Sequence, residues 1–217
     1  MRTYVSTLGY HETRVNRPLL KHGLENDDVV VLVRPARDAD SERGTDAVNY
    51  VEDMLHEIAP DADIVVERID HTEFETAVIE CSDIIQSAEG ELIINFGGGA
   101  REIFLPLTVA TILHAPSISS ALQYTDIDQS VRQWSVPNLS AHVPSNTRET
   151  LAAVGQFGPK VPIAELHEEL DISKSSVSRQ ITTLEDAALV ETATAGKVKH
   201  ATLTFAGRLK LRLIKDD

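Results

Sequence analysis

Cysteine, lysine and long apolar runs are scarce or missing in this chain. The sequence has a single cysteine, Cys81, among 217 residues, so a disulfide framework or a cysteine metal cluster is excluded. No apolar run approaches the roughly 18 residues of a membrane-spanning helix, and the start, Met-Arg-Thr-Tyr-Val-Ser-Thr, lacks the apolar core of a secretion signal. We therefore expect a cytoplasmic protein that does not enter a membrane. Since 42% of its residues are hydrophobic, the chain can still bury the cores of one large domain or two small ones.

Lysine is scarce while acidic residues are in excess. Only seven of the 20 basic residues are lysine, and the net charge is −14. Residues 1–144 contain 24 Asp or Glu and 10 Lys or Arg, whereas residues 145–217 contain 10 of each, so the excess lies in the first two-thirds. This composition resembles that of proteins from salt-loving organisms such as halophilic archaea; an ordinary acidic cytoplasmic protein is the alternative. High salt weakens phosphate contacts, so a DNA-binding segment would rely more on DNA shape and base contacts.

Residues 1–125 alternate short apolar runs with helical patterns. The run Val29–Val33 has no polar alternation, as expected of a central parallel strand that is covered on both faces. Apolar residues recur at steps of three and four over residues 44–59 and 74–88, and residues 103–113 are apolar nearly all round. The last pattern predicts a buried helix with Pro106 in its first turn. Strands are predicted at Thr3–Ser6, Val29–Val33, Ile64–Val66, Leu92–Ile94 and Ser117–Leu122. This order is typical of an α/β fold with a Rossmann-like, mostly parallel sheet.

Two loops are candidates for a ligand site. One joins the strand at 92–94 to a helix through three consecutive glycines, whose backbone can approach a ligand and turn N–H groups toward an anion. Arg101 follows and offers a planar cation suited to phosphate. The other loop follows the first strand, and its Tyr10 could stack on a base. Both open beyond the carboxyl ends of parallel strands, where such sheets bind ligands. The predicted ligand-binding residues are Thr7, Leu8, Gly9, Tyr10, Asn95, Gly97, Gly98, Gly99, Ala100 and Arg101.

The glycine loop does not have the spacing of common nucleotide motifs. It lacks Gly-x-Gly-x-x-Gly, and no Lys-Ser/Thr pair follows it, which disfavours dinucleotide cofactors and P-loop triphosphates. The alternative to a ligand site is a tight turn that needs glycine only for its backbone.

Residues 126–144 interrupt the alternation of strands and helices. The stretch 131–143 predicts an extended arm or edge hairpin that leads to a linker at 143–146. We therefore expect a first domain at residues 1–143, which carries the candidate ligand site, and a second domain at residues 144–217.

The second domain has the pattern of a winged helix-turn-helix. Helices are predicted at 147–157, 164–170, 174–187 and 206–214, with a tight turn at 171–173 whose Ser173 is a good N-cap. Strands at 189–192 and 201–205 enclose a tip at Ala195-Gly196 and form the wing.

The helix at 174–187 is the predicted recognition helix. Its residues off the apolar face are mostly short hydroxyl side chains with one Lys and one Arg, which suits entry into the major groove. Arg179 is the candidate for contacting guanine, and the wing would contact the DNA backbone or minor groove. A winged helix used for dimerisation or protein contact is the alternative. The predicted DNA-binding residues are Lys174, Ser175, Ser176, Ser178, Arg179, Thr182, Lys197 and Lys199, with His200 beside them on the wing.

The whole chain resembles the CRISPR-associated transcriptional regulators that join an N-terminal CARF domain to a C-terminal winged helix. The resemblance is carried by Thr-Leu-Gly-Tyr at 7–10 and by Asn95 with Gly98-Gly99-Ala100-Arg101. It implies a homodimer whose paired loops bind a cyclic oligoadenylate, typically cyclic tetraadenylate, and a second domain that binds double-stranded DNA. The family usually has Ser or Thr where Gly97 stands and Thr or another side chain at Ala100, so two possible phosphate contacts are absent here.

The sequence predicts no catalytic residues, no metal site and no resident cofactor. Some relatives cleave their cyclic ligand, and His11 and Tyr10 are available as a base or positioning group, yet no nucleophile–base–orienter set is visible. The eight histidines lack metal-ligand spacing. Two alternatives stay open: an enzyme that cleaves a cyclic oligoadenylate, and a DNA-binding regulator with a vestigial pocket.

Overall fold

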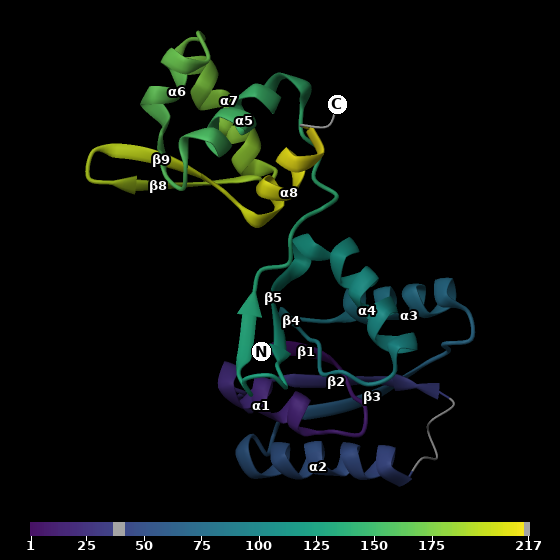
Figure 1. The fold of residues 1–217 in the computed structure, drawn as a ribbon. Helices are drawn as coiled ribbons and strands as arrows, with labels where there is room; N and C mark the ends of the chain where they lie inside the picture. Colours follow the sequence, from purple (N-terminus) through teal and green to yellow (C-terminus); the bar gives the residue numbers. More distant parts are fainter. Residues whose placement is uncertain (37–41, 215–217) are drawn as a thin grey trace. The chain divides into compact units, whose positions relative to one another are not determined.

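The computed structural model describes residues 1–36 and 42–214, and the chain divides into two compact units, Met1–Val136 and Pro137–Asp217 (Figure 1). The division falls earlier than the boundary expected at residue 143. Ala141 and Val143 are buried in the core of the second unit, so the segment before the expected boundary packs with the second unit rather than the first. No helix of the described residues is long and apolar enough to cross a membrane.

The first unit is built on a six-stranded sheet of order β3-β2-β1-β4-β5-β6. All neighbouring pairs are parallel except β5 and β6, which are antiparallel. The Rossmann-like, mostly parallel sheet predicted from the sequence is confirmed. The strands are β1 (Arg2–Thr7), β2 (Val29–Pro35), β3 (Asp63–Ile69), β4 (Glu91–Asn95), β5 (Ile118–Tyr124) and β6 (Val131–Trp134).

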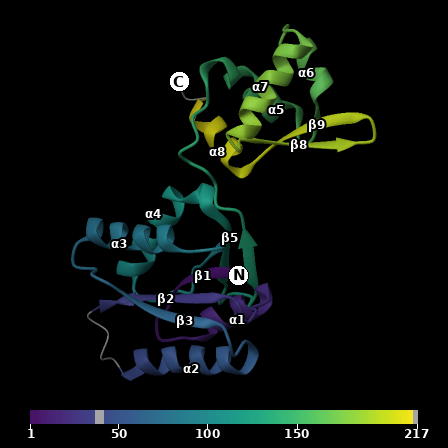
Figure 2. The ribbon, with the colours of Figure 1, turned by 180° about the vertical axis from the view of Figure 1, so that it is seen from behind.

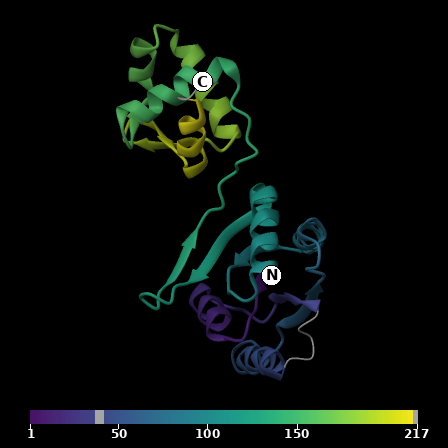
Figure 3. The ribbon, with the colours of Figure 1, turned by 45° about the vertical axis from the view of Figure 1, so that its right-hand side comes forward.

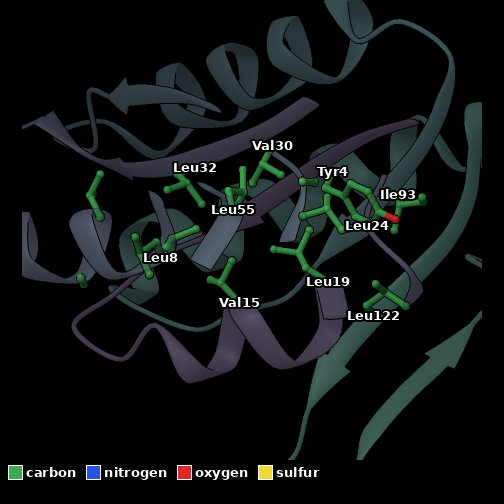
Figure 4. Packing of buried hydrophobic residues seen from close by; sticks show 14 residues of the cluster. Tyr4, Leu8, Val15, Leu19, Leu24, Val30, Leu32, Leu55, Ile93 and Leu122 are labelled. Carbon is green, nitrogen blue, oxygen red and sulfur yellow. The ribbon is translucent and has the colours of Figure 1, made fainter. Parts of the chain in front are cut away.

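Helices cover both faces of this sheet, α1 and α2 on one face and α3 and α4 on the other (Figures 1 and 2). Each face has its own core, because consecutive residues of the central strands point to opposite sides: Tyr4 packs with α1 and α2, and Val5 packs with α3 and α4. Figure 4 shows Val15 and Leu19 of α1 pointing into the first of these cores. The helices are α1 (Thr13–His22), α2 (Glu42–Ile58), α3 (Phe74–Ser87) and α4 (Arg101–Leu113), and α4 is followed by the short 3-10 helix η2 (Ala115–Ser117).

Two helices differ from the sequence prediction. No helix was predicted at α1, which carries Pro18 in its interior. Helix α4 begins at Arg101, directly after the glycine bend and two residues before the apolar run at 103–113, so Pro106 lies beyond the first turn, contrary to the prediction. Because proline has no N–H, the carbonyl of Glu102 lacks its usual partner within the helix.

The predicted edge hairpin is present but short. Strand β6 pairs antiparallel with β5 from Ala121↔Trp134 to Tyr124↔Val131, and the two form a ribbon at the end of the sheet (Figure 3). The remainder of the expected arm, after Trp134, has no regular strand structure.

The second unit has a helix-turn-helix and a three-stranded sheet of order β7-β9-β8. The winged helix-turn-helix is confirmed, although β9 begins at Val198 rather than at 201 and Phe205 already belongs to α8. Gly196, at a φ of 65°, makes the turn between the two wing strands. The elements are η3 (Ser145–Thr147), α5 (Arg148–Phe157), β7 (Val161–Pro162), α6 (Ile163–Glu169), α7 (Lys174–Asp186), β8 (Val190–Ala195), β9 (Val198–Leu203) and α8 (Phe205–Ile214).

Candidate ligand and nucleic-acid sites

The loops after β1 and β4 meet at one edge of the first unit and enclose a cavity of about 320 Å³. Both loops follow strands that are parallel neighbours, so the topology brings their carboxyl ends together. Of the predicted ligand-binding residues, Leu8, Gly9, Tyr10, Gly97, Gly99 and Ala100 line the cavity, together with His11, Arg14 and Pro35.

The two loops touch backbone to backbone. A Cβ added to Gly9 would lie 2.7 Å from the Cα of Gly99, and one added to Gly97 would lie 2.3 Å from the carbonyl oxygen of Thr7. Contacts this close are possible only without side chains. The glycines are therefore needed for the fit between the loops as well as for the turn.

The glycine bend leaves backbone donors available beside the start of α4. Gly98 and Gly99 have φ angles of 92° and 105°, a region that residues with side chains rarely adopt. Within the described part of the chain, the amides of Gly98, Gly99 and Ala100 have no hydrogen-bond partner. A helix of 13 residues begins directly after them, at Arg101. Free amides at a helix start form an environment suited to an anion.

Asn95 and Thr7 lie beneath the cavity rather than in its lining. Asn95 is fully buried, and its Nδ2 donates to Ser6 Oγ at 2.8 Å and to the carbonyl of Arg14 at 3.2 Å. Asn95 therefore ties β4 to β1 and to the first turn of α1. Thr7 is also buried, at the end of β1. The structure gives both residues a supporting position below the loops.

Three arginines lie near the loops of this acidic unit. Arg14 of α1 lines the cavity, and its Nη1 lies 2.9 Å from the position that a Cβ on Gly98 would take. Arg43 of α2 stacks over the ring of Tyr10 at 4.9 Å. Arg101 is exposed in the first turn of α4 and does not line the cavity. Arg14 and Arg43 were not predicted, because their proximity depends on how α1 and α2 pack.

The sequence holds no metal-ligand pattern, and no group of three or more His, Cys, Asp or Glu side chains in residues 1–36 and 42–214 is arranged to hold a metal ion. The donors around the cavity include backbone amides and the guanidinium of Arg14, which suit an anion rather than a cation.

In the second unit, helix α7 presents most of the predicted DNA-binding side chains to solvent. Ser173 caps it by accepting a hydrogen bond from the amide of Ser176 at 3.1 Å. Ser176 itself is half-buried, and its hydroxyl lies 2.9 Å from that of Ser173, so it belongs to the cap. The exposed residues are Lys174, Ser175, Ser178, Arg179 and Thr182.

The wing supplies two exposed lysines with different surroundings. Lys199 lies 3.9 Å from the carboxylate of Glu185 near the end of α7, and Glu185 also accepts a hydrogen bond from the amide of Thr192 at 3.2 Å. Lys197 stands beside Gly196 in the turn and has no ion pair among the described residues. Lys197 is thus the freer of the two cations on the wing, while Lys199 also links the wing to α7.

Two families match the chain. The family described as the Csa3 CRISPR-associated Rossmann-like domain matches residues 2–129, and the MarR family matches residues 144–199. No curated protein matches the chain.

Several solved structures are similar to parts of the chain. FabT of Streptococcus pneumoniae, in complex with DNA, is 26% identical over 34% of this chain and 53% of that chain, with a TM-score of 0.32. YusO of Bacillus subtilis is 22% identical over 34% and 54%, also at 0.32. A MarR family transcriptional regulator of Silicibacter pomeroyi is 20% identical over 54% and 73%, at 0.32. The chain spans about half the length of the first two, and at these TM-scores no functional conclusion rests on the likeness.

Proposed function

Since the chain belongs to the family with the Csa3 CRISPR-associated Rossmann-like (CARF) domain, we propose that it is a transcriptional regulator whose DNA binding responds to a cyclic oligoadenylate. A CARF domain followed by a MarR-type winged helix is the composition of a regulator rather than of an enzyme. In this proposal the first unit binds the ligand as a homodimer, and the second unit binds double-stranded DNA, at promoters connected with CRISPR.

One observation supports the ligand class above all: the glycine bend carries unengaged backbone amides, and its Gly99 and Ala100 line the same small cavity as Arg14. The amides of Gly98, Gly99 and Ala100 are unengaged within the described chain, and Arg14 lies across the bend that carries them. Tyr10 adds an aromatic face, which suits a base. Phosphates with attached bases match this combination better than an apolar metabolite does.

The cavity of one copy is small for such a ligand. Its volume of 320 Å³ lies at the lower end of the roughly 300–1,000 Å³ typical of pockets for drug-sized ligands. A ring of four nucleotides is larger than a drug-sized ligand. A second copy of the loops would supply the remaining surface. This supports a dimer with two loop pairs around one ligand.

Helix α4 offers a surface for that dimer. Four apolar side chains of α4 are exposed: Leu105, Val109, Ile112 and Leu113, at 52%, 43%, 36% and 60%. Leu105, Val109 and Leu113 are four residues apart and Ile112 is three beyond Val109, which places them on one stripe. The stripe lies on the helix that directly follows the glycine bend, so in this proposal α4 of one copy pairs with α4 of the second copy. Exposed apolar stripes of this kind commonly mark a protein interface.

The DNA-binding role rests on α7 and the wing. The second unit is free of the acidic excess of the first, and the polar face of α7 is exposed. A ligand can change DNA affinity only if it prefers one dimer geometry, because a ligand with equal affinity for both geometries shifts nothing. The ligand would then alter the spacing or order of the two recognition helices.

Calorimetric titration with cyclic tetraadenylate tests the ligand assignment. We expect wild-type protein to bind, and Arg14→Ala, which removes the arginine of the cavity lining, to bind at least about tenfold more weakly, as for the loss of a charge-assisted phosphate contact. Arg68→Ala is the control, since Arg68 is exposed on β3 and outside the cavity lining. Absence of heat with cyclic tri-, tetra- and hexaadenylate alike would contradict the proposal.

Sedimentation of Val109→Asp tests the dimer. A buried, unpaired carboxylate at the centre of the α4 stripe should separate the protomers and weaken ligand binding in parallel. An unchanged dimer would place the interface elsewhere.

A further inference from the structure

One face of α1 carries three basic residues, each in contact with the β5–β6 hairpin. Arg14 forms an ion pair with Asp126 at 2.7 Å. Arg17 lies over the ring of Tyr124 at 5.3 Å, and Lys21 donates to the carbonyl of Val131 at 2.9 Å. The spacing of three and four residues puts Arg14, Arg17 and Lys21 on one face of the helix. We call these three residues the α1 basic stripe.

The turn at the end of the hairpin is organised as one unit by Asp128. Its carboxylate accepts hydrogen bonds from the hydroxyl of Thr125 and from the amide and hydroxyl of Ser130, the latter two at 3.1 and 2.8 Å. These hydrogen bonds hold the pKa of Asp128 well below its usual range. The amide of Thr125 also bonds to the carbonyl of Ser130 at 2.9 Å. Because the turn is internally tied, the contact of Asp126 with Arg14 acts on the turn as a whole.

Arg14 belongs to the ligand cavity and to the hairpin at once. It lines the cavity and covers Gly98, while its Nη2 holds Asp126. The side chain is about one-third exposed and that of Asp126 about two-thirds, so the pair is open to solvent and can be exchanged for another anion. The planar guanidinium presents several donors, and a phosphate is an equivalent partner for them.

We propose that an anionic ligand in the cavity competes with Asp126 for Arg14, so that ligand binding loosens the hairpin turn. This inference rests on the proposed function and names its coupling step. In the empty state Arg14 and Asp126 hold the turn against α1. In the bound state a phosphate takes the guanidinium, and Asp126 is released from it.

The hairpin is the segment that would transmit such a change from the first unit to the connection with the second unit. Strand β6 ends at Trp134, and the second unit begins at Pro137, so the hairpin leads directly into the connection between the units. Release of the turn therefore alters the last pair of strands before the second unit. The remaining members of the α1 basic stripe, Arg17 and Lys21, stay attached and make the release local.

A double-mutant cycle on the full-length protein tests the competition, with cyclic tetraadenylate as the probe. Asp126→Asn removes the competing charge, so affinity should rise about two- to fivefold, as for an exposed ion pair. In an Arg14→Gln background the same change should leave the affinity unaltered. Asp53→Asn, an exposed carboxylate on α2, is the control for net charge and should match wild type.

Hydrogen exchange of residues 125–131 supplies a second readout. In wild type, the ligand should speed exchange of the turn amides. In Asp126→Asn these amides should exchange faster already without ligand, and the ligand should add little. Thermal unfolding of the ligand-free variants checks that each is folded.

The outcomes separate the coupling from the ligand assignment. If wild type binds the ligand and Asp126→Asn has wild-type affinity, or if its effect persists in the Arg14→Gln background, the competition is overturned while the proposed function stands. If wild type does not bind, both are overturned.

Discussion

Gly9 and Gly99 lie so close that neither tolerates a side chain toward the other. An added Cβ on Gly9 would lie 2.7 Å from the Cα of Gly99, and one on Gly99 would lie 3.0 Å from the amide nitrogen of Gly9. The partners are backbone atoms, which cannot rotate out of the way. The two loops of the cavity therefore form one rigid assembly whose shape depends on this contact.

Gly9→Ala should separate the loops. We expect the free energy of unfolding to fall by about 1–3 kcal/mol, as for an overpacked contact, and ligand binding to be lost. Gly23→Ala is the matched control: Gly23 has a φ of 93° and open space around it, so alanine there costs about 1–2 kcal/mol in backbone strain. Chemical unfolding with ligand titration checks both. Wild-type affinity in Gly9→Ala would show that the loop contact does not shape the site.

Arg179→Ala should weaken binding to an operator selected by the wild-type protein from a random DNA pool. Loss of a side chain that contacts a base costs about 1–3 kcal/mol and relaxes the preference at one position. Arg212→Ala, on the exposed side of α8, removes the same charge and serves as control. Fluorescence anisotropy with labelled operator and unrelated DNA measures both affinity and preference. If Arg179→Ala keeps full specific binding, α7 is not the base-contacting helix.

Incubation should leave cyclic tetraadenylate intact. His11 and Tyr10 line the cavity, but His11 makes no hydrogen bond to a hydroxyl or thiol within the described residues, so no activated nucleophile is assembled there. Chromatography of the ligand after hours with the protein measures this. Linear products that disappear in His11→Ala would identify an enzyme instead.

His22 should make the stability of the first unit depend on pH. Burial lowers its pKa from 6.5, with a smaller contribution from the positive charge of Arg2, and its Nδ1 lies 2.8 Å from the hydroxyl of Tyr4. Between the two pKa values the unfolded state binds more protons. This contribution to stability is complete above about pH 6.5 and is lost as the pH falls toward the folded pKa.

We therefore expect the free energy of unfolding to decline more steeply from pH 7 to pH 5 in wild type than in His22→Gln. Urea unfolding at several pH values measures the difference between the two proteins, which removes the titration of other groups. Parallel curves would contradict a role for His22.

The sequence predicts those elements whose signal is local. The continuous apolar run of β2 and the three- and four-residue periodicity of α3 placed the sheet and its covering helices correctly. Helix α1 has no such signal: its buried residues are Val15, Pro18 and Leu19, and the proline argues against a helix. Its basic face is stabilised by contacts with the hairpin, which are visible only in three dimensions.

The same distinction applies to the candidate site. The glycine bend is contiguous in the chain, so its position after β4 could be inferred from residues alone. The place of Arg14 could not, since it depends on the packing of α1 beside β4 through Asn95. Asn95 and Thr7 lie within the motifs and are buried at the ends of their strands, so their contact with a ligand stays a prediction.

One edge of the sheet carries Arg14, Arg43 and Arg101 in a unit whose net charge is negative. The electrostatic force on an anion near this edge therefore differs between long and short distances. From afar, the carboxylate excess of residues 1–144 repels polyanions, so nucleic acid is directed away from this unit. Within a few ångströms, the guanidinium groups and bare amides dominate instead. Concentrated salt screens charges beyond roughly 3 Å at 1 M, which removes the repulsion but spares the contacts. If the proposed function holds, a small phosphate ring binds through these short-range contacts to a unit whose net charge repels polyanions.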